Sequence, residues 1–378
     1  MPLDPTILQR YRPEFPVTGS LVYLNHAAIS PISQRVLRAM AGLLEDVAYF
    51  GAVHYEGWRS ALASARQTAA ALINAEPEEI AFVKNTSEGI SFFALGLEWK
   101  KEDEVVSIEG EFPANVYPWK MLESEGVHVR LVGQPNGEIS LDSIDRAINR
   151  HTKAVVVSFV QFLSGYRLDL VKLGRLCADR KVLLFVDAIQ GLGAFTVDVK
   201  EAQIAGLAAD GHKWMLGPEG CGVFFVRRDI LERITPRTVG WMSVEGWEEF
   251  GPRALTWRKD GGRFEGGAPN TAGIYGLHAA ISLLREVGVE QIAERILDLT
   301  DRLRSGLTQR GYNVYGPMER EHCSGIVSFS PLNGSAEEVT QLLHHHHVIV
   351  SARRGLVRVS PHFYNTEEEI DRLLELLA

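Results

Sequence analysis

A buried strand that ends in an aspartate is the first feature of this chain with the means to do chemistry. The apolar run Val182–Val186 leads directly into Asp187, and Gln190 follows three residues later. Ligands of parallel sheets bind at the carboxyl ends of the strands, so Asp187 is expected at a site. A carboxylate at that depth needs a cationic partner, and a protonated pyridine nitrogen, within reach of Gln190, is one candidate. A simple cap on the following turn is the alternative that this segment leaves open.

A lone lysine in an apolar, glycine-rich loop is the second such feature. Lys213 lies within the segment Gly211–Gly217, beside Trp, Met and Leu, shortly before the apolar run Gly222–Val226. Such surroundings disfavour the ammonium form and leave an amine that forms Schiff bases. Lys213 follows Asp187 by 26 residues, enough for one crossover and one strand, so the two are expected at neighbouring strand ends. The pair favours a catalytic lysine over a surface lysine with a buried stem.

Two further segments could hold the remainder of a phosphorylated pyridine cofactor. Thr86 and Ser87 follow the apolar run Ile80–Val83 and open a predicted helix, whose free N–H groups and hydroxyls would form an anion site. An ordinary N-cap is the alternative there. His212 is a second candidate phosphate ligand. Phe112 follows another apolar run and could stack on a pyridine ring, although core packing explains an aromatic residue there equally well.

Apolar runs that alternate with amphipathic stretches define the expected architecture. Strands are predicted where Val, Ile, Leu and Phe are nearly continuous, at 80–83, 104–108, 127–132, 154–160, 182–186 and 222–226. Helical patterns between them imply an α/β fold with a mostly parallel sheet wrapped by helices. We expect a large domain over residues 16–285 and a small α+β domain over residues 286–378, with residues 1–15 packed on the latter. Residues 236–273 are expected to form a long, ordered loop region.

Composition and charge exclude several classes of function. The chain has 39 Lys and Arg against 48 Asp and Glu, a net charge of −9, and no basic stripe, which argues against nucleic-acid binding. The longest apolar runs are too short to cross a bilayer, and the first residues lack the apolar core of a secretory signal. Three widely spaced cysteines, Cys177, Cys221 and Cys323, fit buried free thiols in a reducing compartment. We therefore expect a cytoplasmic protein without a membrane partner.

Three other patterns carry less weight. The run Gln190–Gly193 lacks the third glycine and the ribose carboxylate of a dinucleotide loop, and Gly211–Lys213 lacks the spaced glycines of a P-loop. The four histidines His344–His347 end a predicted amphipathic helix, and only the first and the last share a helical face well. A solvated helix end explains them better than a metal site, so no metal is expected.

In their order and spacing, these and other segments resemble the class V aminotransferase family of enzymes that depend on pyridoxal 5′-phosphate (PLP), which have fold type I. The matching segments cover nearly the whole chain and are Tyr23–Ala28, Asn85–Glu88, Asp187–Gln190, Gly211–Lys213, Arg263–Thr271, Arg358 and Phe363–Glu369. The resemblance is greatest to the branch of cysteine desulfurases, selenocysteine lyases and isopenicillin N epimerase-like proteins.

The resemblance implies a role for individual residues. Lys213 would carry PLP as a Schiff base, Asp187 would pair with the pyridine nitrogen, and Gln190 would pair with the ring hydroxyl. The other implied cofactor residues are Phe112 on the ring and Thr86, Ser87, His212 and Thr271 on the phosphate, with Thr271 supplied by the second subunit of a homodimer with shared sites. The implied substrate residues are Arg358, as a bidentate carboxylate clamp, with Asn25, His26 and Ala28.

Three departures from the family pattern bear on the reaction. Many desulfurases carry a mobile loop with a nucleophilic cysteine shortly before the clamping arginine. The corresponding stretch of this chain, residues 348–355, is short and contains no cysteine. Phe112 stands where many of them stack a histidine. Asp210 stands where relatives often have a phosphate-binding serine, which leaves more of that task to His212 or turns the Asp210 side chain away.

We therefore expect an enzyme that binds a small amino acid as an external aldimine and removes its α-proton. The missing loop cysteine favours a lyase, by C–S cleavage or another β-elimination, or an epimerase. An aminotransferase is the alternative, and a cysteine desulfurase that uses Cys323 is disfavoured. A PLP-binding module without catalysis is the non-enzymatic alternative, which the presence of Lys213 argues against.

Overall fold

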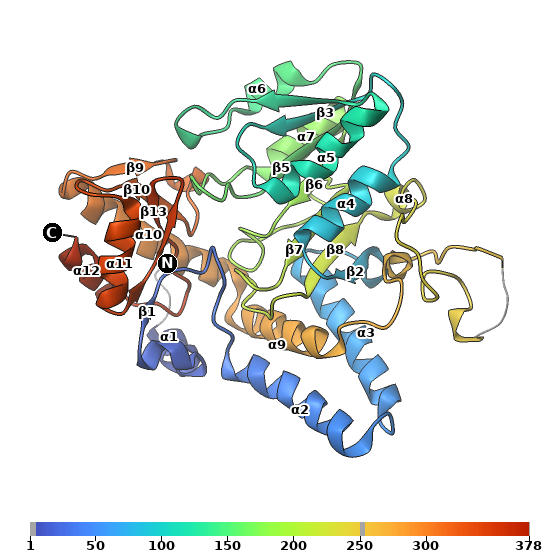
Figure 1. Cartoon of the computed structure of the whole chain (residues 1–378), viewed down its shortest axis with the longest axis horizontal. Coiled ribbons are helices and arrows are strands. Elements are labelled where there is room, and N and C mark those ends of the chain that lie inside the picture. Colours follow the sequence, from blue (N-terminus) through green and yellow to red (C-terminus); the bar gives the residue numbers. More distant parts are fainter. Residues whose placement is uncertain (1–4, 250–253, 378) are drawn as a thin grey trace.

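A sheet-centred body and a smaller body beside it make up the chain in the computed structural model, which describes residues 5–249 and 254–377 (Figure 1). The sheet lies in the cyan to yellow part of the chain, and the smaller body is built from the orange and red C-terminal elements. The helix α9 (Thr271–Val287) belongs to the larger body, and α10 (Val289–Gln309) leads from it into the smaller one, where it packs against α12 (Glu367–Leu376).

The central sheet has seven strands in the order β2-β8-β7-β6-β5-β3-β4. Their bounds are β2 Ile80–Val83, β3 Glu104–Ile108, β4 His128–Val132, β5 Thr152–Ser158, β6 Leu183–Asp187, β7 Gly206–Asp210 and β8 Gly222–Val226. Only β8 runs against its neighbours, so the expectation of a mostly parallel sheet is confirmed. The spacing from Asp187 to Lys213 predicts one strand between them, but not its bounds, because the residues of β7, Gly-Leu-Ala-Ala-Asp, hold too few large apolar side chains to form a visible run.

Helices cover both faces of the sheet and bury alternate residues of each strand. In β5, Val155 and Val157 belong to one core cluster, whereas Ala154 and Val156 belong to the other. On the second face, Phe93 of α4 stacks on Phe185 of β6 with the ring centroids 4.4 Å apart. The helices of this body are α2 Gln34–Phe50, α3 Tyr55–Leu72, α4 Thr86–Gly96, α5 Tyr117–Lys120, α6 Leu141–Ala147, α7 Leu170–Asp179 and α8 Arg228–Leu231.

The C-terminal body is a four-stranded antiparallel sheet in the order β12-β13-β10-β9, packed with helices. Its elements after α10 are β9 Asn313–Tyr315, β10 Val327–Ser330, α11 Ala336–His345, β11 Val348–Ile349, β12 Ser351–Arg353, β13 Leu356–Val359 and α12 Glu367–Leu376. The N-terminal strand β1 (Val22–Tyr23) pairs with β11, so the segment that follows β1 is carried from the small body toward the large one. The predicted division at residues 285 and 286 falls in the last turn of α9.

The described N-terminal residues contact both bodies. Arg12 forms an ion pair with Glu369 of α12 at 2.7 Å, and Tyr11 donates a hydrogen bond to Glu286 of α9. Residues 1–4, which were expected to pack on the small domain, lie outside the described residues. Residues 236–273 were expected to form a long, ordered loop region, and outside 250–253 the described part contains short 3₁₀ turns and one isolated bridge, Val244–Trp257, before α9. Within the described chain, no helix combines the length and hydropathy needed to cross a membrane.

The helix α7 packs closely against the backbone that connects β6 to β7, at Gly174. A Cβ atom on Gly174 would lie 1.8 Å from the carbonyl oxygen of Ala202, in the backbone between β6 and β7. We expect Gly174→Ala to lower the free energy of unfolding by about 3 kcal/mol, because neither backbone can move without disturbing the sheet. Gly42→Ala in α2 is the control, since no heavy atom lies within 4 Å of the added group. Urea denaturation measures both, and equal stabilities would refute the packing described.

Candidate active site

Asp187 ends β6 as a buried carboxylate, and only one of its two oxygens forms a hydrogen bond within the described chain. One oxygen, Oδ1, accepts a hydrogen bond from the Ile189 backbone N–H at 3.1 Å. The other, Oδ2, is buried and has no partner among the residues that the structure describes. Burial, and then the nearby charge of Glu111, raise the pKa of Asp187 to about 7. An orphaned buried carboxylate oxygen requires a cationic donor, and a pyridinium N–H meets that requirement.

Lys213 lies in the loop that follows β7, the strand next to β6. Register pairs Asp187 with Ala208 of β7, so the predicted meeting of the two residues at neighbouring strand ends is confirmed. Burial lowers the pKa of Lys213 to about 8, and the charge of Arg358 acts in the same direction, whereas Asp187 opposes the shift. The amine therefore reaches its neutral, nucleophilic form at a lower pH than a surface lysine does.

The backbone around Lys213 is fixed by segments that are remote in sequence. Ser30 donates its hydroxyl hydrogen to the carbonyl of Lys213 at 2.6 Å and its N–H to the carbonyl of His212 at 2.7 Å. The His362 ring lies 3.1 Å from the carbonyl of Trp214. These bonds hold the loop between the N-terminal segment and the C-terminal body, so the position of the Lys213 amine depends on the whole chain.

Gln190 faces the same region but its amide is partly engaged. Its Nε2 donates to the carbonyl of Ala27 at 3.0 Å, and its Oε1 accepts from the indole N–H of Trp214 at 2.9 Å. The Nε2 group still has a second hydrogen to donate. That hydrogen is the group available for a ring hydroxyl.

The expected phosphate cradle combines the start of α4 with the end of β7. Thr86 is buried and accepts a hydrogen bond from the Asp210 N–H at 3.1 Å, while Ser87 is exposed. Asp210 turns away from this cradle: one carboxylate oxygen accepts from the Gly211 N–H, and the other lies 3.0 Å from Nδ1 of His212. The imidazole and carboxylate are close but are not aligned for a hydrogen bond. Because only Nδ1 of His212 faces this carboxylate, Nε2 of His212 could still donate to an anion.

Thr271 is the predicted phosphate residue whose hydroxyl forms no hydrogen bond to this cradle within the described chain. It opens α9, and its hydroxyl makes its one hydrogen bond within the described chain to the carbonyl of Pro269, at 3.5 Å. The preceding residue, Asn270, lines a cavity of about 540 Å³ together with Lys84 and Gly220. Within the described chain, then, the Thr271 hydroxyl forms no hydrogen bond to a residue of the Lys213 site.

Phe112 lies over Lys213 as the stacking interpretation requires. The Lys213 Nζ atom is 5.5 Å from the centre of the Phe112 ring, which is 42% exposed and meets Phe162 edge to face at 5.4 Å. An aromatic residue that packed in the core would be buried. The exposed ring face beside the lysine supports stacking on a planar ligand.

Arg358 of β13 brings a buried guanidinium from the small body to the site. It is 2% exposed, and it donates from Nη1 to the carbonyl of Phe162 at 2.8 Å. Its Nε is buried without a partner in the described chain, and no described carboxylate pairs with it. Burial, and then the charge of Arg353, lower the pKa of Arg358 to about 9. A buried cation without a counterion is suited to hold a substrate carboxylate.

The three remaining predicted residues form a turn at the end of the N-terminal segment. The side-chain oxygen of Asn25 is buried without a partner, and Ala28 is half-buried, with its N–H on the carbonyl of Asn25. His26 is fully buried, with Nδ1 2.8 Å from the Ser360 carbonyl and Nε2 2.6 Å from the Tyr364 hydroxyl. Both ring nitrogens are therefore used in packing, and the arrangement does not support a direct bond from His26 to substrate.

Glu111 is a buried member of the site that sequence reasoning did not select. Its carboxylate accepts hydrogen bonds from the N–H and hydroxyl of Ser158 and from Nε2 of Gln161. Ser158 is the register partner of Asp187, and burial raises the pKa of Glu111. Its position directly before Phe112 was the available signal, because an acidic residue at a strand end needs donors from neighbouring strands.

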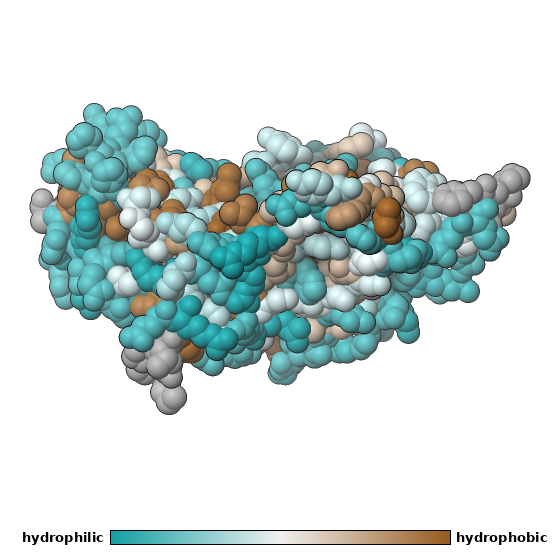
Figure 2. Space-filling view, turned by 90° about the horizontal axis from the view of Figure 1, so that it is seen from below, coloured by the Kyte–Doolittle hydropathy of each residue, from teal (hydrophilic) through white to brown (hydrophobic). Residues whose placement is uncertain are grey.

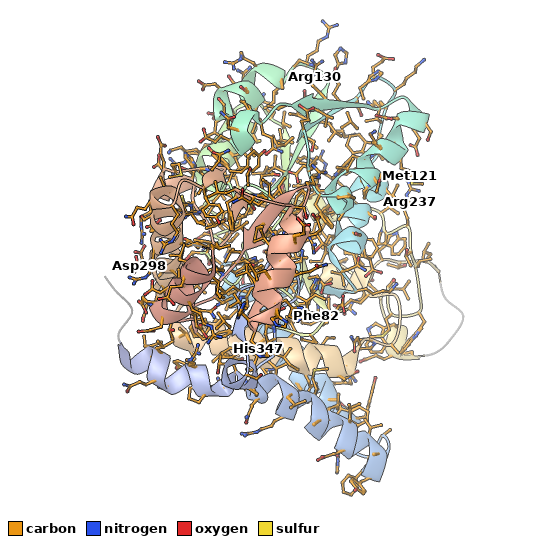
Figure 3. The ribbon with its side chains drawn as sticks, turned by 60° about the vertical axis from the view of Figure 1, so that its left-hand side comes forward. Phe82, Met121, Arg130, Arg237, Asp298 and His347 are labelled. Atoms are coloured by element: carbon orange, nitrogen blue, oxygen red, sulfur yellow. The ribbon has the colours of Figure 1, made fainter. Side chains whose placement is uncertain are left out.

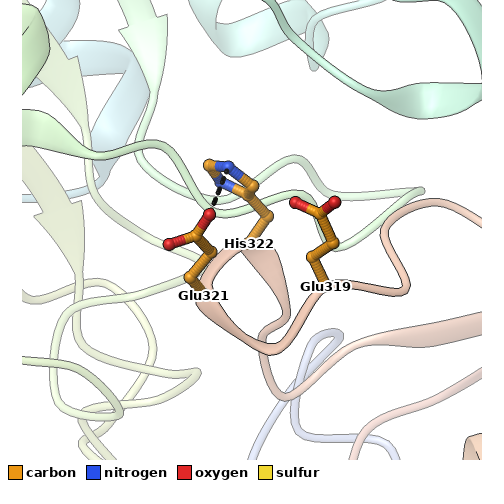
Figure 4. Close-up of side chains that lie close together, drawn as sticks. All are labelled: Glu319, Glu321 and His322. Atoms are coloured by element: carbon orange, nitrogen blue, oxygen red, sulfur yellow. Dashed lines mark ion pairs between the residues drawn. The ribbon is translucent and has the colours of Figure 1, made fainter.

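Other groupings of ionisable side chains lie outside this site. Within the described residues, Glu319, Glu321 and His322 form the one group of three or more side chains whose potential metal-ligand atoms lie within 4.8 Å of one another (Figure 4). The two glutamates are exposed, and His322 stacks on Tyr166 at 4.7 Å, so packing explains the histidine. The four residues His344–His347 are all exposed, and His347 lies two residues beyond the end of α11 (Figure 3), as expected for a solvated helix end.

Together, the unpartnered Asp187 oxygen, the buried Lys213 amine and the adjacent aromatic and anion-binding groups fit PLP. The fold and this site define a PLP-dependent enzyme of fold type I. The model of the class V aminotransferase family matches residues 22–373, and the chain belongs to that family.

Three similar proteins illustrate the relationship. A probable cysteine desulfurase from Pyrococcus abyssi is 31% identical, with 97% of this chain and 96% of the relative covered. The apo structure of the cysteine desulfurase from Thermococcus onnurineus NA1 has a TM-score of 0.90 at 27% identity, covering 100% of this chain and 97% of that one. The structure of the cystine C–S lyase C-DES, in complex with its reaction product cysteine persulfide, has a TM-score of 0.88 at 24% identity. The match covers 96% of this chain and 98% of that one, and it shows that the two proteins share a fold.

The first site prediction concerns Asp187 in the enzyme stripped of cofactor. Because its folded pKa is raised above the unfolded value, the protein loses stability as the pH rises from about 4 through about 7. We expect Asp187→Asn to stabilise the apoenzyme at pH 8 by on the order of 2 kcal/mol, and the gain to fade toward pH 4, where the folded carboxyl is protonated in any case. Urea titrations at both pH values measure it. A pH-independent difference would contradict the burial of an unpaired charge.

The second site prediction concerns Arg358. Arg358→Ala is expected to weaken substrate binding by about 2–5 kcal/mol, because a buried carboxylate would lose its partner. Arg358→Lys should recover only part of this loss, since an ammonium lacks the bidentate fork. Steady-state kinetics measure both variants, and cofactor absorbance checks that each is loaded. Unchanged apparent affinity in Arg358→Ala would mean that another group holds the carboxylate.

Proposed function

We propose that this enzyme is a C–S lyase that cleaves a small sulfur-containing amino acid by elimination and keeps no persulfide on its own cysteines. The observation that carries the proposal is the connection between β12 and β13. It consists of two residues, Arg354 and Gly355, with φ angles of +48° and +79°. Positive φ at both positions is the mark of a tight type I′ hairpin, and such a turn cannot carry a swinging loop.

The cysteines support the same conclusion. All three are buried and free of disulfides. Burial raises the pKa of each thiol, to about 12 for Cys177, which disfavours the nucleophilic thiolate. Cys323, the loop candidate, is fully buried, and its Sγ lies 3.4 Å from the carbonyl of Pro317. No described thiol is therefore placed to receive sulfur from a substrate.

The side chains divide the reaction between them. Bound PLP supplies an electron sink that makes the substrate α-proton acidic. Asp187 holds the proton of the pyridine nitrogen, Arg358 orients the carboxylate, and Lys213 takes the proton from Cα. The Cβ–S bond then breaks, with its electron pair leaving on sulfur. With the uptake of one water, the amino acid becomes pyruvate, ammonia and the sulfur product.

The relatives support C–S chemistry and define the competing mechanism. C-DES carries out such a cleavage, and we transfer that reaction class to this chain as part of the proposal. The relative from Pyrococcus abyssi is a probable cysteine desulfurase, so sulfur transfer to a protein thiol is the alternative to be tested. Buried free thiols support a cytoplasmic setting for either reaction.

We further propose that the enzyme is a homodimer with shared sites. The Thr271 hydroxyl forms no hydrogen bond to a described residue of the Lys213 site, which leaves it available to serve the second copy. The arm formed by α2 and α3 extends away from the sheet (Figure 1), and hydrophobic side chains interrupt the hydrophilic surface seen from below (Figure 2). Large exposed apolar residues of this arm are Leu37, Leu44, Val47, Tyr49, Phe50, Val53 and Tyr55. A second copy would bury them.

Product analysis tests the proposed reaction. With L-cysteine and L-cystine, we expect pyruvate and ammonia in equal amounts, no alanine and no change of chirality in the remaining substrate. A variant with Cys177, Cys221 and Cys323 all changed to Ala should keep most of its turnover, whereas Lys213→Ala should lose it. Alanine as the product, together with loss of activity in Cys323→Ser, would instead establish a desulfurase that transfers sulfur through a thiol.

A further inference from the structure

The hairpin of β12 and β13 gathers polar groups on one face. Ser351 is the register partner of Arg358, and Arg353 is the partner of Leu356. Opposed residues of an antiparallel pair, and residues two apart along a strand, share a face of the sheet. Ser351, Arg353 and Arg358 therefore point the same way. The charge of Arg358, which lies on this face, lowers the pKa of Lys213.

Several polar groups of this hairpin lack partners. Ser351 is 6% exposed, and its hydroxyl, like Nε of Arg358, is buried with no hydrogen bond to any described residue. Arg353 donates to the carbonyl of Ala352 at 2.9 Å, and neither it nor Arg354 forms an ion pair with a described acid. The charge of Arg353 lowers the pKa of both Arg358 and Lys213. The hairpin thus presents three guanidinium groups without a counterion.

The outermost of these arginines is connected to the reacting lysine through two aromatic rings. The guanidinium of Arg354 lies 5.3 Å from the centre of the Phe162 ring. Phe162 contacts Phe112 at 5.4 Å, and Phe112 lies 5.5 Å from Nζ of Lys213. Arg354 is exposed and sits in the tight turn, so its backbone is fixed while its guanidinium lies beside Phe162, the ring that contacts Phe112.

We propose that Arg353 and Arg354 form a second carboxylate subsite, which selects substrates whose sulfur leaving group ends in a carboxylate. The inference rests on the proposed C–S lyase function. One guanidinium fork accommodates one carboxylate, and Arg358 is matched to the α-carboxylate beside Lys213. Two cations remain for a second anion. A disulfide amino acid such as cystine carries that anion at the far end of the group that leaves.

A matched pair of substrates tests the subsite. L-Cystine is compared with the mixed disulfide of L-cysteine and cysteamine, which lacks only the far carboxylate. We expect the wild-type enzyme to prefer cystine at least tenfold in kcat/KM, equivalent to about 1.4 kcal/mol. Arg354→Asn should reduce this preference about tenfold, and Arg353→Gln should reduce it as well. Asn-Gly is a favoured type I′ turn, so Arg354→Asn retains the hairpin.

Arg372→Gln is the control for loss of one positive charge from the small body. Arg372 is exposed on α12 and donates to the carbonyl of His346, and this variant should keep the wild-type preference. If the wild type shows no preference for cystine, or if Arg354→Asn lowers activity equally with both substrates, the second subsite does not exist. Equal loss in Arg353→Gln alone would assign Arg353 to the α-carboxylate and overturn its part of the subsite.

Binding of an unreactive compound separates this inference from the proposed function. 3,3′-Dithiodipropionate is cystine without its amino groups, and it is compared by calorimetry with the monocarboxylate 3-(ethyldithio)propionate. We expect the dicarboxylate to bind the wild type about tenfold more tightly and to lose this advantage in Arg354→Asn. Absence of pyruvate from every sulfur amino acid would refute the lyase alone. Equal binding of the two carboxylates would refute the subsite, whatever the reaction.

Discussion

The burial of two opposite charges at adjacent strand ends is the constraint on which this structure depends. Asp187 and Lys213 are both removed from water, and their mutual attraction offsets only part of the cost, since the pKa of each is shifted toward its neutral form. The cost is met by the rest of the fold, which buries a large apolar core on both faces of the sheet. In return, the carboxylate oxygen and the amine are held ready for a cationic ring and an aldehyde carbon.

The two bodies of the chain are joined at this same place. Ser30 and His362 bond to consecutive carbonyls of the lysine loop, and they come from opposite ends of the sequence. Arg358 reaches the site from β13 and is tied to the carbonyl of Phe162, at the end of the large sheet. Movement of the small body relative to the sheet would therefore displace the carboxylate clamp and the loop together. The groups expected to bind the cofactor and the substrate are therefore held in place by the same contacts between the two bodies.

Much of this arrangement could be predicted from the sequence, because strand-end residues follow from apolar runs. The strands that precede Asp187 and Phe112 were visible as such runs, and the spacing from Asp187 to Lys213 placed both at one edge of the sheet. β7 was not visible, since its small residues pack under aromatic side chains of α4 rather than forming a run of their own. The roles of His26 and Glu111 depend on partners more than 40 residues away, Tyr364 and Ser158, which no local pattern identifies.

The turn at Arg354 and Gly355 has a consequence for how such enzymes diversify. It is exposed and joins two strands whose pairing does not depend on its length, and connections of this kind accept insertions without loss of the fold. Lengthening it would add a loop beside Arg358 while β12, β13 and the lysine loop stayed in register. Gain or loss of a sulfur-carrying thiol is then an evolutionary step separate from the cofactor chemistry. If the proposed function holds, a change in chain length at this one surface position could add or remove a thiol-bearing loop and leave the cofactor site as it is.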